Sequence, residues 1–169
     1  MRLIPLLLPP LVFLPLVAVS AGDAPLDRAT LRGLKAVSVV LDPLAPELER
    51  QGLTQKDLQT RLEARLKDAR IPIDPSATAF LGLRVTSVRA NRGPFALCFS
   101  VGAFQSVVLV RDKNIQTNTS TWEVETVVMA DPKVLHQASL ESVDELAGRF
   151  ITAWRSVNQQ GTAPTEAPK

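Results

Sequence analysis

The pattern of hydrophobic and polar positions divides the chain into four extended and two helical segments. Residues 34–41, L-K-A-V-S-V-V-L, are apolar and β-branched and end at Asp42-Pro43, which is typical of a buried strand. Three further β-segments cover residues 80–90, 95–110 and 117–129, with short turns at residues 91–94 and 111–114. Connections this short favour an antiparallel meander.

Two segments follow the helical period instead. In residues 54–69, Thr54 and Asp57 have the spacing of a capping box, followed by an apolar stripe. The stripe comprises Leu58, Leu62, Leu66 and Ala69. A second helix is predicted to begin at Ser139 or Ser142, the latter with Glu145 as a capping box, and to end near residue 157. Its apolar positions are Val143, Leu146, Ala147, Phe150, Ile151, Trp154 and Val157.

The resulting order, β-α-β-β-β-α, predicts an α+β fold. The two one-sided helices pack most simply on one face of a four-stranded mixed sheet. The pattern leaves open whether the first strand lies beside the second or the fourth.

The third β-segment is unusually long. Sixteen residues at about 3.3 Å each would span more than 50 Å, so the strand must bend, and Gly102 is the candidate position. Alternation places Phe104 on the face away from the helices. In the following strand it places Trp122 towards the helices and Glu123 and Glu125 on the opposite face.

The N-terminus predicts export. A charge at Arg2 precedes an almost wholly apolar run, and Val19-Ser20-Ala21 offers small residues to a signal peptidase. We therefore expect residues 1–21 to be a signal peptide, residues 22–158 a single domain, and residues 159–169 a disordered tail rich in Gly, Pro, Thr and Ala. A retained anchor is the alternative, although four prolines interrupt the run. After cleavage we expect no stable membrane span.

Charge and composition exclude several classes. Removing residues 1–21 leaves 18 basic and 17 acidic side chains, and this near-neutral balance argues against a nucleic-acid partner. The single cysteine, Cys98, cannot form a disulfide within its own chain. With one Cys and one His, the chain lacks the ligands of a zinc site. We expect no metal or other cofactor.

Catalytic chemistry has one weak candidate. Cys98 could act as a nucleophile if His136, with Asp131 to orient it, came within hydrogen-bond reach. However, Cys98 lies in the middle of a strand among small and apolar neighbours, where a thiol is ordinarily inert packing. We therefore expect no catalytic residues. A small thiol-dependent hydrolase, or a carrier of a small apolar ligand between helices and sheet, remains an alternative.

Several motifs carry a resemblance to known proteins: L-R-G-L-K-A-V-S-V from residue 31, G-L-T from residue 52, L-x-x-R-L-x-x-A-x-I-P from residue 62, Q-S-V-V-L-V-R from residue 105, and Thr121-Trp122. With these motifs the chain resembles a group of small exported bacterial proteins that are uncharacterised. The predicted layout is also similar, more loosely, to envelope accessory modules such as the N-terminal domain of TolB and the lipoprotein LptE. The resemblance implies a role in binding partners rather than in catalysis.

These observations predict an exported, periplasmic or secreted, non-catalytic domain that binds a protein or another envelope component. The partner, the oligomeric state and the fate of the leader stay open. The second hairpin, residues 105–122, is the predicted binding surface, because protruding hairpins and unpaired edges recruit partners by strand addition. Its candidate residues are Phe104, Arg111, Asp112, Lys113, Asn114 and Trp122.

Overall fold

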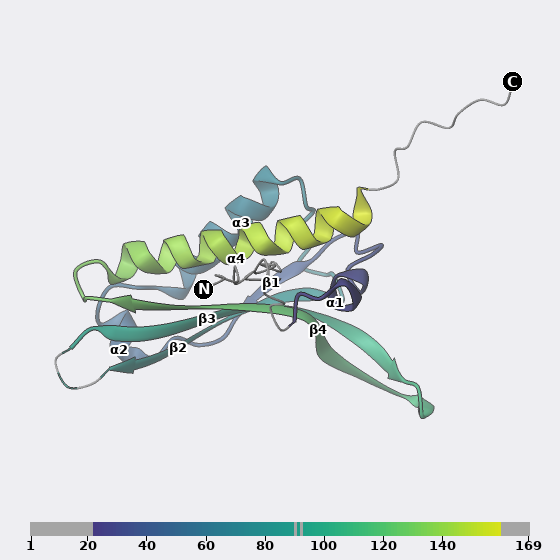
Figure 1. Cartoon of the computed structure of the whole chain (residues 1–169), viewed down its shortest axis with the longest axis horizontal. Helices are drawn as coiled ribbons and strands as arrows, with labels where there is room; N and C mark the ends of the chain where they lie inside the picture. The colour runs from purple at the N-terminus through teal and green to yellow at the C-terminus, as the bar shows by residue number, and fades with distance from the viewer. Residues whose placement is uncertain (1–21, 90, 92, 160–169) are drawn as a thin grey trace, which may run out of the picture.

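A four-stranded sheet carries two long helices on one face, as the computed structural model shows (Figure 1). The structure describes residues 22–89, 91 and 93–159. The predicted leader, residues 1–21, and residues 160–169 of the predicted tail lie outside the described part. The α+β fold class with a mixed sheet is confirmed.

The sheet has the strand order β1-β2-β3-β4. Its strands are β1 (Ser38–Leu41), β2 (Phe80–Arg89), β3 (Phe95–Leu109) and β4 (Asp112–Ala130). β1 pairs with β2 in parallel, whereas β2–β3 and β3–β4 are antiparallel. The first strand therefore lies beside the second, which answers the question that the pattern left open, and β1 and β4 are the two edges.

β1 is shorter than the predicted strand of residues 34–41, because side chains of the C-terminal helix bind the backbone of the preceding segment. The indole Nε1 of Trp154 donates to the carbonyl of Leu34 at 3.0 Å, and the Asn158 amide donates to the carbonyl of Leu31 at 2.9 Å. The segment before β1 thus binds the end of the C-terminal helix, and Val37 adds one isolated parallel bridge, to Ile73. Hydrophobic pattern alone does not reveal this competition.

The helices are α1 (Pro25–Ala29), α2 (Pro46–Glu49), α3 (Gln55–Asp68) and α4 (Leu135–Asn158). The capping box at the start of α3 is confirmed, since Thr54 Oγ1 accepts from the Asp57 amide at 3.1 Å and Asp57 Oδ2 accepts from the Thr54 amide at 3.2 Å. Across the helix layer, Arg61 Nε of α3 donates to Asp144 Oδ1 of α4 at 2.8 Å.

The predicted start of α4 is wrong. The helix begins at Leu135, and the hydroxyls of Ser139 and Ser142 donate to the carbonyls of Leu135 and Ala138, four residues earlier. Both serines are therefore interior helical residues, and Ser142 with Glu145 is no capping box. Such back-bonding explains how buried serines are accommodated inside a helix.

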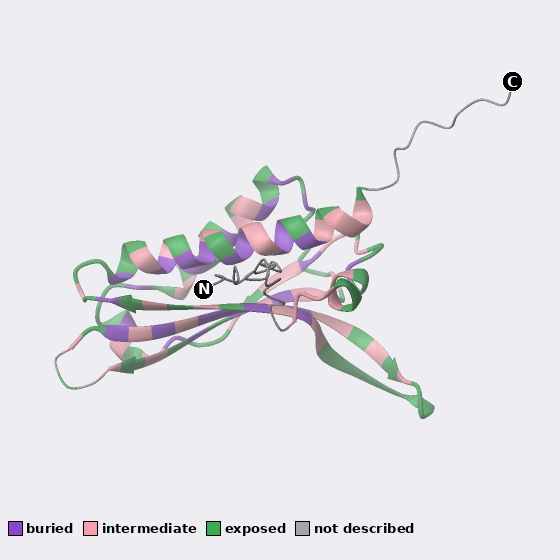
Figure 2. Ribbon diagram, in the orientation of Figure 1, coloured by how far each residue is buried: buried purple, intermediate pink, exposed green. Residues whose placement is uncertain are grey.

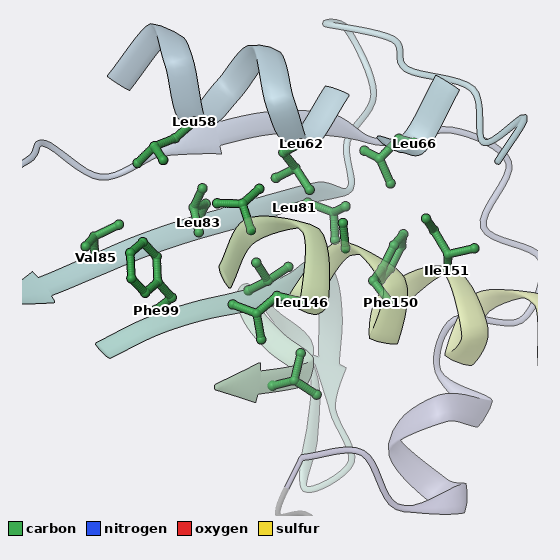
Figure 3. Close-up of a cluster of buried hydrophobic side chains, with 14 of the residues drawn as sticks. Leu58, Leu62, Leu66, Leu81, Leu83, Val85, Phe99, Leu146, Phe150 and Ile151 are labelled. Carbon is green, nitrogen blue, oxygen red and sulfur yellow. The ribbon is translucent and has the colours of Figure 1, made fainter. Parts of the chain in front are cut away.

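The core lies between the helices and the sheet (Figure 3). Leucines of α3 meet the inward row of β2, and α4 adds further apolar side chains beside them. Each large side chain buried here contributes about 1.5–3 kcal/mol from removal of its surface from water. The buried residues labelled in Figure 3 are Leu58, Leu62, Leu66, Leu81, Leu83, Val85, Phe99, Leu146, Phe150 and Ile151.

Candidate functional site

β3 and β4 continue beyond the rest of the sheet as a two-stranded ribbon. The pairing of β2 with β3 stops at Phe80 and Phe104, whereas β3 and β4 remain paired to the end of the hairpin. We call residues 105–120 the ribbon. Every residue from Arg111 to Thr119 is exposed, and Figure 2 shows the ribbon leaving the body with little buried surface. The structure thus displays a protruding hairpin.

A bulge marks the place where the ribbon leaves the body. Ala103 is paired with Trp122 but Phe104 with Ser120, so Thr121 is an extra residue on β4. Its hydroxyl donates to the Ala103 carbonyl at 3.3 Å. Bulges bend and twist a strand. The predicted bend is thus present, but the irregularity lies at Thr121 of the partner strand and not at Gly102.

Phe104 lies on the helix-free face of the sheet at the base of the ribbon. Its ring stacks on Phe80 with centroids 4.8 Å apart. A Cβ on Gly82 would come within 2.8 Å of the Phe104 ring, and one on Gly102 within 3.2 Å. The two glycines therefore leave room for the half-buried ring over the strands.

A shallow depression of about 240 Å³ borders this aromatic pair. Its rim is polar: Arg84 Nε donates to Asp42 Oδ2 at 2.8 Å, and the Ser100 hydroxyl donates to Glu123 Oε1 at 2.6 Å. These polar groups are already hydrogen-bonded in pairs. Farther along the same face lie the exposed apolar side chains Val88, Val127 and Met129.

Trp122 belongs to the core and not to an exposed binding surface. Its side chain is 1% exposed and meets the ring of Phe150 edge-on at 5.3 Å. The indole Nε1 donates to Asp23 Oδ1 at 2.8 Å. Asp23, which sequence pattern did not single out, thus fastens the start of the domain to β4, and Arg28 holds its other oxygen at 2.7 Å.

The other candidate residues, Arg111, Asp112, Lys113 and Asn114, are all exposed at the tip of the ribbon. The turn itself consists of Val110 and Arg111, since Leu109 pairs with Asp112; β4 therefore begins earlier than the predicted residue 117. Asp112 Oδ1 accepts from the Asn114 amide at 3.0 Å. Exposed apolar side chains interleave with these polar ones, at Val108, Val110 and Ile115.

The outer edge of β4 is occupied near the body. The Glu123 amide donates to the Gly22 carbonyl at 3.2 Å, and the Thr30 hydroxyl donates to the Thr121 carbonyl at 3.2 Å. Arg149 Nη1 donates to the Glu125 carbonyl at 3.0 Å. Among the described residues, no hydrogen bond from outside the hairpin reaches the backbone of residues 116–120. The open part of the edge therefore coincides with the ribbon.

The structure does not bring Cys98 and His136 together. Cys98 lies on the helix-free face of β3, whereas His136 lies in the first turn of α4, with its Nε2 3.5 Å from Asp57 Oδ2. Burial, and to a lesser extent the charge of Glu125, raises the pKa of the Cys98 thiol. A raised pKa disfavours the thiolate that nucleophilic catalysis needs.

The described residues contain neither a metal-binding cluster nor a membrane-spanning helix. Within residues 22–89, 91 and 93–159, no group of three or more His, Cys, Asp or Glu side chains lies close enough to hold a metal ion. In that same part of the chain, no helix has the length and hydrophobicity required to cross a membrane.

Comparison with known proteins shows distant structural likenesses. No family model matches the chain, and no curated protein matches it. The PelC dodecamer from Paraburkholderia phytofirmans is similar with a TM-score of 0.42 and 11% identity, over 69% of this chain and 86% of that one. A minor lipoprotein from Acinetobacter baumannii gives 0.36 and 14%, over 74% and 93%. Neither likeness is close enough to carry an argument about function.

Proposed function

We propose that this protein is an exported, envelope-associated interaction module that binds a protein partner through the ribbon, by strand addition and without catalysis. The observation that carries the proposal is the ribbon itself: paired strands that extend past the sheet, are exposed along the tip, and keep an open backbone edge. Backbone groups on such an edge offer main-chain hydrogen bonds to an incoming strand.

The chemistry of the ribbon fits recognition better than catalysis. Its tip combines exposed aliphatic side chains, Val108, Val110 and Ile115, with the charged Arg111 and Lys113. A mixture of apolar contact surface and a polar rim is common at protein interfaces. The leader predicted at residues 1–21 supports a location outside the cytoplasm, where the partner would be found.

The decisive experiment is site-specific photo-crosslinking in intact cells that express the tagged, exported chain. A photoreactive residue at Thr117 reports on the ribbon, and the same residue at Lys56 on the exposed surface of α3 serves as the control. We expect a discrete crosslinked protein at Thr117 and none at Lys56. Mass spectrometry then identifies that protein.

A deletion tests whether the ribbon is needed. Removing residues 108–116 and joining the paired residues Val107 and Thr117 by an Asn-Gly turn keeps the register of the strands, and should abolish the Thr117 crosslink while the body still folds. The matched control, Lys56→Gln, changes one exposed charge on the helical face and should retain the crosslink. Unchanged folding together with an unchanged set of captured partners after the deletion would contradict the proposal.

A further inference from the structure

The open edge of the ribbon lacks the usual safeguards against pairing with another strand. Residues 114–122, N-I-Q-T-N-T-S-T-W, contain no charged residue, no proline and no glycine. Natural edge strands are ordinarily protected by Lys or Pro, by a bulge, or by a covering segment. Near the body β4 has such protection, from Thr121 as a bulge and from Gly22 and Thr30 as a cover. Nearer the tip, the register shift between Val108 and Leu109 leaves residues 113–115 outside the ladder. Among the described residues, 116–120 have none of these protections.

The pairing pattern identifies which backbone groups this edge presents. The Glu123 amide points away from the sheet to Gly22, so the neighbouring Trp122 directs its backbone groups to Ala103 in β3. These directions alternate along antiparallel strands. Thr119 and Thr117, opposite Gln105 and Val107, therefore also bond within the hairpin. The N–H and C=O groups of Gln116, Asn118 and Ser120 face the open edge.

We propose that this edge pairs antiparallel with the same edge of a second copy of this chain, about a two-fold axis at Asn118. The inference rests on the proposed function, because it names the partner of the same ribbon. Asn118 then faces its own counterpart, and Gln116 faces Ser120 of the second copy. Each outward-facing residue gains a partner, as the isologous symmetry of a two-fold dimer requires.

The charge distribution favours a second copy of the chain as the partner, and an antiparallel direction for the pairing. Arg111 and Lys113 outnumber Asp112 at the tip, whereas Glu123 and Glu125 lie where β4 enters the body. Antiparallel pairing lays the basic tip of each copy towards the acidic end of the other. A parallel arrangement would align tip with tip and so oppose like charges, which is destabilising. At the centre of the pair, uncharged residues meet uncharged residues.

A proline substitution at the two-fold axis provides the first test. Asn118→Pro removes an amide that faces the open edge and leaves the groups facing β3 intact. We expect sedimentation velocity of the exported full chain to show a dimer, with a dissociation constant raised about tenfold or more by Asn118→Pro. Asn118→Ala keeps the amide and should dimerise as the parent chain does.

Cysteine crosslinking tests the register without depending on stability. In a Cys98→Ser background, Asn118→Cys should link to itself rapidly with a short bifunctional thiol reagent. Gln116→Cys alone should link slowly, but should link rapidly when mixed with the Ser120→Cys variant. Equal self-linking at positions 116 and 118 would overturn the proposed axis.

The outcomes separate this inference from the proposed function. A chain that is monomeric up to ~0.1 mM, where micromolar complexes are already formed, but still crosslinks a different protein at Thr117, overturns self-pairing and leaves the proposed function standing. A dimer that is insensitive to Asn118→Pro overturns the assignment of the edge. A monomer without any ribbon-dependent crosslink overturns both.

Discussion

The same two strands behave differently on either side of Thr121. In the body, β3 and β4 present alternating buried residues such as Phe99, Val101 and Val124, which α4 covers. In the ribbon, the pairing of β3 with β4 continues beyond the layer of α3 and α4, and the side chains of residues 111–119 are exposed (Figure 2). The bulge separates a packed segment from an exposed one.

This difference shows that hairpin pairing and tertiary packing are separable. An isolated two-stranded hairpin is marginally stable in water, so the ribbon depends on its continuity with the packed part of β3 and β4. The body, by contrast, owes its stability to side-chain burial. We therefore expect substitutions in the body to change the free energy of unfolding, and substitutions in the ribbon to change association.

Trp122→Ala should have the largest effect on stability. The indole is fully buried against Phe150, so its removal leaves a cavity and should lower the free energy of unfolding by about 3–5 kcal/mol. Urea denaturation followed by circular dichroism measures the loss. Trp122→Phe retains much of the packing but not the bond to Asp23, and should cost less. A loss below about 1 kcal/mol for Trp122→Ala would show that the body is less tightly packed than described.

Gly82→Ala should have the next largest effect, because its Cβ would collide with the ring of Phe104 at 2.8 Å. Displacing that ring should cost about 1–3 kcal/mol. The comparison is a double-mutant cycle: in a Phe104→Ala background the same Gly82→Ala change should cost much less. Equal costs in both backgrounds would contradict the ring's role at the base of the ribbon.

Asp23→Asn should reduce stability by about 1–2 kcal/mol and change its dependence on pH. Burial alone would raise the pKa of Asp23, but hydrogen bonds from Arg28 and Trp122 outweigh it and hold the pKa below its usual value. The stabilisation by the carboxylate is therefore present above about pH 4 and lost as the pH falls through the lowered folded-state pKa. Denaturation measured at each pH from 7 to 2 gives the free energy of unfolding, which should fall less steeply with decreasing pH for Asp23→Asn than for the parent chain. The same dependence on pH in both chains would argue against this contact.

Val110→Ser should have the smallest effect on folding. The side chain is 95% exposed at the tip, so the free energy of unfolding should change by less than about 0.5 kcal/mol. The same variant should weaken ribbon-dependent crosslinking if the tip contacts the partner. A large loss of stability would instead mean that the ribbon and the body unfold as one unit.

Sequence reasoning succeeded where the signal is local and periodic. The stripe of Leu58, Leu62 and Leu66 and the capping box at Thr54 require only neighbouring residues, and both are confirmed. The alternation of Trp122 with Glu123 correctly assigned the two sheet faces. These patterns together led to the α+β architecture.

The remaining features depend on contacts between residues far apart in the chain. The hydrogen bond between Trp122 and Asp23 joins residues 99 positions apart, and the local sequence around either residue does not indicate the other as its partner. The bulge at Thr121 arises from the register between β3 and β4. The start of α4 was missed for a local reason: Ser139 and Ser142 bond back to carbonyls of their own helix, which the hydrophobic pattern does not reveal. For the candidate site, sequence located the hairpin tip but assigned Trp122 to its surface, although the same alternation pointed that side chain inward.

The fastening of Gly22 and Asp23 to β4 has a consequence for the order of events during maturation. Proteases cut chain that is accessible and extended. The peptide bond predicted for leader removal lies between residues 21 and 22. In the folded chain, the Gly22 carbonyl accepts from the Glu123 amide, and the Asp23 carboxylate accepts from the Trp122 indole. Processing at that bond would therefore be fastest on the nascent chain, so the rate of folding sets the time available for it.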